Sequence, residues 1–497
     1  MFLVFVLIVT VLGLLLIDSR KPKHFPPGPR WLPSIGNLFL VHKLRATYGF
    51  FYLVWHHFYQ SYGPVVGIRI GRTFLVIVLG RDAIREFYNM DSVNGRPIGF
   101  FYRIRTFNKR LGVVFNDGDF WDIQRKFSLK VLRQMGMGRA NMIEQIESEC
   151  IEMVKFFTKK STNDQLIEMQ HAFDIPVLNI LWTLIAGYRF EHDDERLQKL
   201  LKMIHECFRV VDMTGGILNL LPWVRYFIPV KSGYKPLVDN HKQLWSFLRE
   251  VVNETRAKNS NERPKSFINS YLEELESKSN GENIHGSFSD EQLLSICLDF
   301  FQAGTETTSN TLSFGLMYMV HNRRVCDQVQ AELDAVIGQK RFPNLQDRNH
   351  LPYVEAVLSE IQRFSNVAPL GIAHRTTENT QFKEYVIPKD TVILMSLYSV
   401  NMDKDYWHDP DIFRPERFLN ENGEYIPHTE QFLPFGLGKR RCMGENLAKA
   451  SLFLYFATFM HAFNMIVPNN VSLPNIKPID GITLQPRPFK LQLKPRF

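Results

Sequence analysis

FGLGKRRCMG, residues 435–444, is the most informative stretch of this chain. Its three glycines allow sharp backbone turns and the close approach of a flat ligand. Three basic residues precede Cys442, and basic neighbours favour the thiolate, which is the form of cysteine that binds metals. A helix expected from Glu445 onward would also direct its N-terminal amides toward the sulfur. A thiolate so placed can serve as an axial ligand to a metal such as haem iron, and a lone surface cysteine in a glycine turn is the alternative.

The other cysteines and the composition exclude several classes of protein. Besides Cys442, the chain has four cysteines: Cys150, Cys207, Cys297 and Cys326. They are widely spaced and form no C-x-x-C pair, so neither a disulfide nor a zinc framework is predicted, and a reducing compartment is expected. With 497 residues, 45% hydrophobic and 22% charged, the chain can form a globular core that encloses a bulky cofactor.

The charge balance argues against nucleic acid as a partner. Lys and Arg number 59 against 51 Asp and Glu, which gives a net charge of +8. Because no run of five basic residues occurs, no nucleic-acid-binding tail is expected. An anionic membrane surface or an acidic protein partner fits the basic excess better.

The N-terminal run MFLVFVLIVTVLGLLLI, residues 1–17, carries no charge. A helix rises about 1.5 Å per residue and needs roughly 17–25 apolar residues to cross a bilayer, so this run is at the short limit. Basic residues follow the run, which favours an uncleaved signal anchor over a removed signal peptide and a body that faces the cytosol. Residues 18–33, rich in proline, are predicted to form a stiff hinge.

The body, residues 34–497, is predicted to be mostly helical with a minor β-sheet. Residues 64–79 read as a β-hairpin, a short strand is expected at 391–397, and a last apolar helix at 445 to about 463. The polar region 254–286 is predicted to be an exposed connection. Residues 215–229 are apolar but too short to span a membrane, and they belong either to the core or to a second membrane contact.

A long helix is predicted from the capping-box sequence SDEQ at 289–292 to about His321. Its middle, AGTETT at 303–308, combines poor helix formers with a glutamate that is costly to bury without a partner. This cluster of unfavourable choices predicts a functional break, with an exposed polar stretch as the alternative. Gly304 would let a bulky group approach the backbone, and Glu306 and Thr307 are suited to passing protons.

Glu360 and Arg363 lie three residues apart on a predicted amphipathic helix, so their side chains meet. Taken alone, an E-x-x-R pair is a weak signal, because most such pairs are solvated salt bridges. PERF at 415–418 adds a second guanidinium, that of Arg417. A carboxylate held between two guanidiniums is predicted to lock this irregular part of the chain.

These motifs together resemble the cytochrome P450 family from about Pro26 to the last residue. The signature F-x-x-G-x-R-x-C-x-G is matched at 435–444, A-G-x-E-T-T at 303–308 and E-x-x-R at 360–363, in the order and spacing of the family. The resemblance implies the P450 fold, in which 34–497 form a haem-thiolate catalytic domain around haem b with an axial cysteine thiolate.

The resemblance also implies roles for single residues. Cys442 would be the proximal iron ligand, and Glu306 and Thr307 would deliver protons during the cleavage of dioxygen. For His374, an ordinary hydrogen-bonded histidine is the alternative to a cofactor contact. The cofactor-binding residues implied by resemblance are Arg96, Trp121, Arg125, His374, Arg440, Phe435, Gly438 and Gly444; the structural residues are Glu360, Arg363 and Arg417.

The implied reaction is monooxygenation of a hydrophobic small molecule with O2 and electrons from NADPH–cytochrome P450 reductase, at the endoplasmic reticulum membrane. Basic residues near the thiolate side would suit the acidic reductase, for example Lys126, Arg133, Lys439 and Lys449. A solvated charged face is the alternative for these four. Two non-monooxygenase alternatives are a reductase-independent peroxide isomerase and a haem-thiolate sensor, and the Glu306-Thr307 pair argues against both.

The substrate is expected to be lipid-like, because the segments implied to face it are hydrophobic on balance. These segments are 98–113, 207–213, 298–303, 367–371 and Ile482. Residues 95–118 and 211–222 are similar to the insect microsomal branch related to the vertebrate family-two enzymes. Within this branch the similarity is greatest to epoxidases that convert methyl farnesoate to juvenile hormone; another lipid, a steroid or a xenobiotic is the alternative substrate.

Overall fold

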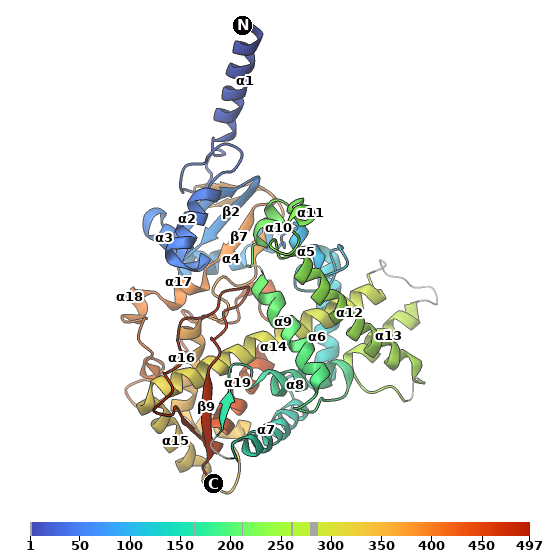
Figure 1. Cartoon of the computed structure of the whole chain (residues 1–497), viewed down its shortest axis with the longest axis vertical. Coiled ribbons are helices and arrows are strands. Elements are labelled where there is room, and N and C mark those ends of the chain that lie inside the picture. The colour runs from blue at the N-terminus through green and yellow to red at the C-terminus, as the bar shows by residue number, and fades with distance from the viewer. Residues whose placement is uncertain (1, 163–164, 211, 260–261, 279–286) are drawn as a thin grey trace.

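The computed structural model describes residues 2–162, 165–210, 212–259, 262–278 and 287–497, and helices predominate among them (Figure 1). The longer helices are α1 (Phe2–Asp18), α2 (Leu38–Tyr48), α3 (Phe51–Tyr62), α4 (Arg81–Asn89), α6 (Gly118–Gln134), α7 (Ala140–Lys160), α8 (Asp174–Ala186), α9 (Glu195–Val210), α12 (Tyr234–Ala257), α13 (Phe267–Lys278), α14 (Asp290–His321), α15 (Arg323–Ile337), α16 (Pro352–Ser365) and α19 (Glu445–Ala462). The shorter ones are α5 (Phe100–Ile104), α10 (Gly216–Leu220), α11 (Val224–Phe227), α17 (Leu397–Asn401) and α18 (Lys404–Trp407).

The strands form small sheets beside this helical mass. They are β1 (Val65–Ile70), β2 (Thr73–Val78), β3 (Leu166–Glu168), β4 (His374–Arg375), β5 (Thr380–Phe382), β6 (Tyr385–Ile387), β7 (Val392–Met395), β8 (Phe463–Ile466) and β9 (Lys490–Pro495). The main sheet has the order β1-β2-β7-β4, in which β1 and β2 are the predicted hairpin and β7 is the strand expected near 391–397. A second sheet has the order β3-β9-β8.

The long helix α14 crosses the body, and α8, α12, α16 and α19 pack on it (Figure 1). Ser289 caps the helix as predicted, because its side chain accepts a hydrogen bond from the backbone N–H of Gln292. The other half of the predicted capping box is wrong: the Gln292 side-chain oxygen instead accepts the backbone N–H of Gly112 at 2.8 Å. Gln292 is fully buried, so it ties α14 to the loop before α6.

The predicted exposed connection at 254–286 is wrong in its middle. α12 continues to Ala257, and α13 follows with Phe267, Ile268 and Tyr271 fully buried. These side chains belong to the apolar core around α14, so their burial outweighs the polar composition of the segment. Residues 260–261 and 279–286 of this region lie outside the described residues.

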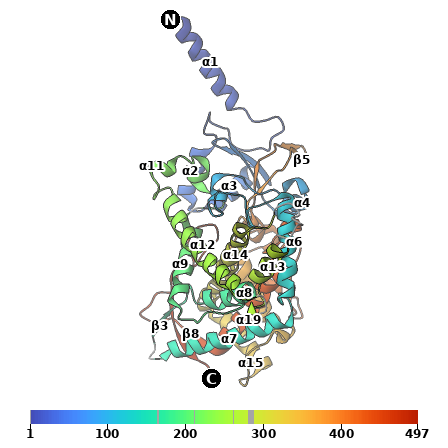
Figure 2. The ribbon, with the colours of Figure 1, turned by 90° about the vertical axis from the view of Figure 1, so that its right-hand side faces the viewer.

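The N-terminal helix α1 projects from the body, and its residues are largely exposed (Figures 1 and 2). Within the described part of the chain, which omits Met1, no helix has both the length and the apolar character to cross a membrane. The predicted anchor at 1–17 is thus not confirmed. The hinge at 18–33 is more than a linker, because Phe25 and Trp31 are buried against the main sheet and Trp31 stacks on Phe74.

Residues 215–229 do not join the core as a whole. They form α10 and α11, in which Leu218 and Val224 are buried while most other apolar side chains are exposed. The exposed fraction reaches 55% for Trp223 and 75% for Phe227. Both short helices lie at the end of the body from which α1 projects (Figures 1 and 2).

Candidate active site

The predicted cysteine loop folds as a tight turn in front of α19. Gly436 and Gly438 have φ values of +68° and +66°, in the left-handed region that favours glycine. A Cβ atom at Gly438 would lie 2.4 Å from the Tyr88 carbonyl oxygen, so only glycine fits there. The backbone N–H of Cys442 donates to the carbonyl of Phe435 at 3.0 Å and closes the loop. Gly444 is the residue directly before α19.

The basic neighbours of Cys442 do not act as the sequence suggested. Lys439 pairs with Asp91, and Arg441 pairs with Glu445, so their charges are directed elsewhere. Although Cys442 has an accessible side, burial raises the pKa of the thiol and outweighs the lowering by the Gly444 backbone N–H, Arg125 and Arg441. A bound metal would still deprotonate the thiol, because coordination favours the thiolate far more strongly than a neighbouring cation does.

One face of α14 is accessible in the middle of an otherwise buried helix. Ala303 is exposed and Gly304 and Thr307 are half-buried, whereas nearly all residues from 292 to 319 around them are buried. The Thr307 hydroxyl donates to the Ala303 carbonyl at 2.9 Å. The predicted role of Gly304 needs a correction: a Cβ atom there would lie 2.3 Å from a methyl carbon of Leu181, so the glycine admits α8 to close packing.

Three arginines lie near the cysteine loop: Arg96, Arg125 and Arg440. We call them the cationic cluster. Within the described residues, the side chains of these three arginines donate hydrogen bonds to backbone carbonyls, which carry no charge. Burial, together with repulsion from neighbouring guanidiniums, lowers the pKa of Arg96 to about 10 and that of Arg440 to about 8. The Nη1 atom of Arg440 is buried without a hydrogen-bond partner. Among the described residues, no carboxylate forms an ion pair with any of these three guanidiniums, although Asp117 accepts the backbone N–H of Arg96.

Trp121 and His374 border the cationic cluster but differ from expectation. The Trp121 indole N–H donates to the Val113 carbonyl at 3.0 Å, so it is not available to bind an anion. The Trp121 ring lies 3.6 Å from the Arg440 guanidinium and stabilises that cation directly. His374 Nδ1 lies 2.9 Å from the Val93 carbonyl, and burial lowers the pKa of His374 well below its ordinary value. A carboxylate beside its other nitrogen would favour the protonated ring.

These residues fit the group that the sequence predicts. An accessible cysteine on a tight loop can ligate an iron, and the accessible strip of α14 leaves a surface free for a flat ring. The unpartnered nitrogen of Arg440 and the surplus positive charge of the cationic cluster suit the carboxylates that such a group carries. The chemistry of the donor set therefore agrees with a haem.

Comparison with known proteins agrees with this geometry. The family model described as Cytochrome P450 matches residues 26–493. The chain belongs to the cytochrome P450 family. It is 38% identical to a protein named farnesoate epoxidase from Bombyx mori, over 97% of this chain and 96% of that protein. It is 35% identical to human cytochrome P450 2J2, over 97% and 93%, and 34% identical to probable cytochrome P450 305a1 of Drosophila melanogaster, over 100% and 99%.

Family membership settles the class of this P450. It is a haem-thiolate enzyme of a monooxygenase family, in which a cysteine ligates the haem iron. Its fold is the P450 fold, mostly helical with small sheets. The predicted family, cofactor and enzyme class are confirmed.

A carboxylate and two guanidiniums lie together as expected: Glu360, Arg363 and Arg417. We call them the balanced cluster. Arg363 donates two hydrogen bonds to the Glu360 carboxylate, at 2.7 and 2.8 Å, and Arg417 donates a third at 3.2 Å. The remaining donors bind backbone carbonyls of the irregular segment, among them Asn401 and Trp407. Charge and hydrogen bonds are satisfied within the protein, and α16 is thereby joined to 401–417.

Glu306 is not free to face Thr307. Its carboxylate is fully buried and accepts from His205 Nδ1 at 2.5 Å and from Arg209, Asn310 and Thr483. Burial would raise the pKa of Glu306, but these partners, with His205 foremost, lower it below its ordinary value. Glu306 therefore ties α14 to α9.

The sequence interpretation missed Asp299, which joins two segments expected to face the substrate. Asp299 is buried in α14, pairs with Arg105 at 2.6 Å and accepts the backbone N–H groups of Val113 and Val114. A charged residue in the apolar run LLSICLDFF, residues 293–301, was the available signal, because a buried carboxylate needs partners. Val211, in the segment 207–213, lies outside the described residues.

Proposed function

We propose that this P450 epoxidises methyl farnesoate with one oxygen atom from O2 and electrons from NADPH. The observation that carries the proposal is the 38% identity to the farnesoate epoxidase of Bombyx mori over nearly the full length of both chains. The segments proposed to face the substrate supply apolar side chains for a terpenoid chain, among them Phe101, Met213, Leu298, Val367 and Leu370, all of which are buried.

The charges of these segments favour the methyl ester over the free acid. Arg105 is paired with Asp299, and Arg209 is paired with Glu306. Each guanidinium is thus already neutralised by a buried carboxylate, so neither offers its full charge to a carboxylate on a substrate. A neutral ester group needs no such counter-ion.

Each residue of the site has a proposed task. Cys442 holds the iron of haem b, which supplies oxygen activation when bound. Arg440, Arg96 and Arg125, with His374, hold the propionates, and Phe435, Gly438 and Gly444 shape the loop around the sulfur. Thr307, on the accessible strip of α14, holds and passes a proton, and Glu306 supplies protons to it after leaving His205 and Arg209.

Electrons are proposed to come from NADPH–cytochrome P450 reductase at the endoplasmic reticulum membrane. Support comes from exposed lysines near the thiolate side, such as Lys126, Lys439 and Lys449. We propose that α1 and the exposed apolar side chains of α10 and α11 contact this membrane, since they lie at one end of the body. The body then faces the cytosol.

Turnover tests the substrate. The full chain with a P450 reductase, NADPH and O2 is offered methyl farnesoate and, in parallel, farnesoic acid, and products are separated by chiral chromatography and identified by mass spectrometry. A single epoxide of the ester, formed only with NADPH, is expected. Faster epoxidation of the acid would contradict the ester preference, and no product from either would reject this substrate class.

The iron ligand is tested separately. Cys442→Ala is expected to abolish the reduced carbon-monoxide absorption band of a thiolate-ligated haem, because no other cysteine lies in the loop. Cys326→Ala, at a buried cysteine of α15, is the control and keeps the band. If Cys442→Ala kept the band, another residue would be the ligand.

A further inference from the structure

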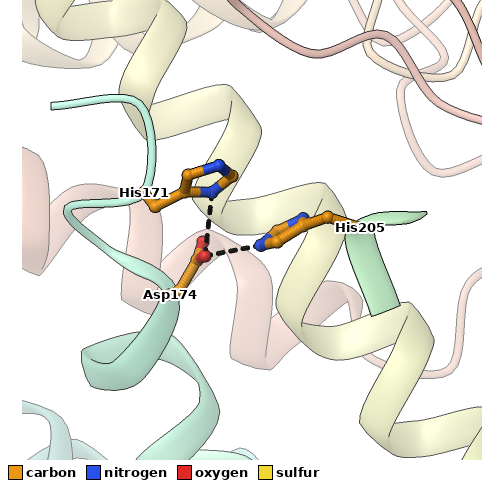
Figure 3. Close-up of side chains that lie close together, drawn as sticks. All are labelled: His171, Asp174 and His205. Carbon is orange, nitrogen blue, oxygen red and sulfur yellow. Dashed lines mark hydrogen bonds and ion pairs between the residues drawn. The ribbon is translucent and has the colours of Figure 1, made fainter. Parts of the chain in front are cut away.

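Two histidines and an aspartate from separate elements meet beside α14, outside the haem site (Figure 3). His171 lies in the turn before α8, Asp174 is the first residue of α8, and His205 lies on α9. One carboxylate oxygen of Asp174, Oδ2, is 3.0 Å from His171 Nδ1 and 2.6 Å from His205 Nε2. All three potential ligand atoms lie within 4.8 Å of one another.

We propose that His171, Asp174 and His205 form a binding site for a divalent transition-metal ion of the zinc type. Two imidazole nitrogens and one carboxylate oxygen are the donor set that zinc accepts, with bonds of about 2.0–2.2 Å. In a tetrahedral site neighbouring donors then lie about 3.4 Å apart. The two distances from Asp174 Oδ2 to the histidine nitrogens are each shorter than this by less than about one ångström. Small side-chain rotations can lengthen them to that value.

The residues around the three ligands hold them as metal ligands are held in proteins. His205 turns its other nitrogen, Nδ1, to the Glu306 carboxylate at 2.5 Å, which fixes the ring and directs Nε2 toward Asp174. Ser309 donates to the second oxygen of Asp174 and fixes that carboxylate. A carboxylate behind a ligating histidine is the usual outer contact of such sites, because it orients the ring and raises its basicity.

The exposure of the three side chains gives an ion a way in. The His171 side chain is 38% exposed, whereas Asp174 and His205 are 5% and 11% exposed. An ion can approach from the His171 edge and meet the two buried ligands behind it. The fourth coordination position then faces solvent on the same edge and can hold a water molecule.

Zinc uptake by the haem-loaded full chain, purified without a polyhistidine tag, tests the proposal. Equilibrium dialysis against Zn2+ followed by elemental analysis is expected to show one zinc per haem in the wild type. His171→Ala removes one ligand at an exposed position and is expected to weaken uptake at least tenfold. His42→Ala removes an exposed imidazole on α2 and serves as the matched control that leaves uptake unchanged.

X-ray absorption at the zinc edge identifies the ligands independently of the haem iron. Nitrogen and oxygen neighbours with imidazole scattering support the proposal, and the reduced carbon-monoxide band confirms that each variant remains folded with haem. Equal uptake by wild type and His171→Ala, no uptake by wild type, or a sulfur neighbour would each overturn it. This result is independent of the substrate, so failed turnover with methyl farnesoate leaves the test intact.

Discussion

The balanced cluster is a buried group of charges, whereas in the cationic cluster Arg96 is buried and Arg125 and Arg440 are half-buried; the two clusters also differ in charge. In the balanced cluster, Glu360 lies between Arg363 and Arg417, and every guanidinium binds a carboxylate. In the cationic cluster, Arg96, Arg125 and Arg440 bind uncharged carbonyls and repel one another.

The difference separates charges that hold the fold from charges that hold a ligand. A buried ion pair with all hydrogen bonds made is complete, so removing one partner leaves the other uncompensated. A buried surplus of cations is incomplete, and its cost is recovered only when an anion binds. The unpartnered Nη1 atom of Arg440 indicates that the cationic cluster binds an anion, because native proteins rarely bury a polar atom without a partner.

Breaking the balanced cluster is expected to have the largest effect. Arg363→Ala leaves the buried Glu360 with only Arg417, and the loss of a buried pair costs about 3–5 kcal/mol in the free energy of unfolding. Thermal or denaturant unfolding of the haem-loaded protein measures it. Arg323→Ala, which breaks an exposed pair with Asp327 on α15, is the control. Equal loss in both variants would contradict the distinction between balanced burial and surface pairing.

Removing a member of the cationic cluster is expected to weaken cofactor retention more than folding. On the proposal that Arg440 binds a haem propionate, Arg440→Ala removes one charge-assisted hydrogen bond of about 1.5–3 kcal/mol, so haem should leave roughly tenfold to a hundredfold faster. Transfer of haem to an acceptor protein measures the rate. Arg441→Ala, the neighbouring exposed residue paired with Glu445, should lose haem at the wild-type rate. If both variants behaved alike, the cationic cluster would not hold the cofactor.

Local patterns predicted the parts of this molecule that depend on near neighbours in sequence. The glycines of 435–444 predicted the tight cysteine loop, since Gly436 and Gly438 have the backbone conformation that other residues avoid. The hairpin of β1 and β2, the bounds of α14 and the helix α19 also followed from alternation, capping and apolar spacing. The contacts of Glu360 were predictable because E-x-x-R and PERF occur together.

Contacts between distant elements were not predictable in this way. Glu306 binds His205 and Arg209, about a hundred residues away, so its sequence neighbour Thr307 gave no sign of these partners. Gly304 was predicted to let a bulky group approach the backbone, and the group that approaches it here is Leu181 of α8. Which face of α14 meets α8 and α9 depends on tertiary packing, and a single sequence leaves that rotation undetermined.

Asp117 is the carboxylate beside the cationic cluster, and removing it is expected to have an intermediate, pH-dependent effect. Burial would raise the pKa of Asp117, but hydrogen bonds from Arg110, the Arg96 backbone and Arg375 lower it. A lowered pKa gives stability that is present above the unfolded value of about 3.9 and lost as pH falls through the folded value.

Asp117→Asn is therefore expected to lose about 1–3 kcal/mol of unfolding free energy at neutral pH. The difference from wild type should shrink as pH falls from about 4 through the lowered folded pKa, because the unfolded chain takes up the Asp117 proton first and the folded carboxylate takes it up last. Denaturant unfolding at several pH values measures this. A difference that stayed constant to acid pH would mean that the Asp117 charge does not stabilise the fold.

The smallest effect is expected at Lys126, the sequence neighbour of Arg125 on α6. Lys126 is exposed and pairs with Asp122 at 2.5 Å, four residues earlier, and such a pair contributes about 0.3–0.5 kcal/mol. Lys126→Ala should therefore leave unfolding and haem release close to wild type, while Arg125→Ala should release haem faster. The loss of Lys126 should instead raise the KM for the reductase roughly twofold at low salt, because exposed charges act on association and are screened by ions. Reductase titrations at two salt concentrations measure this, and a wild-type KM at both would remove Lys126 from the proposed interface.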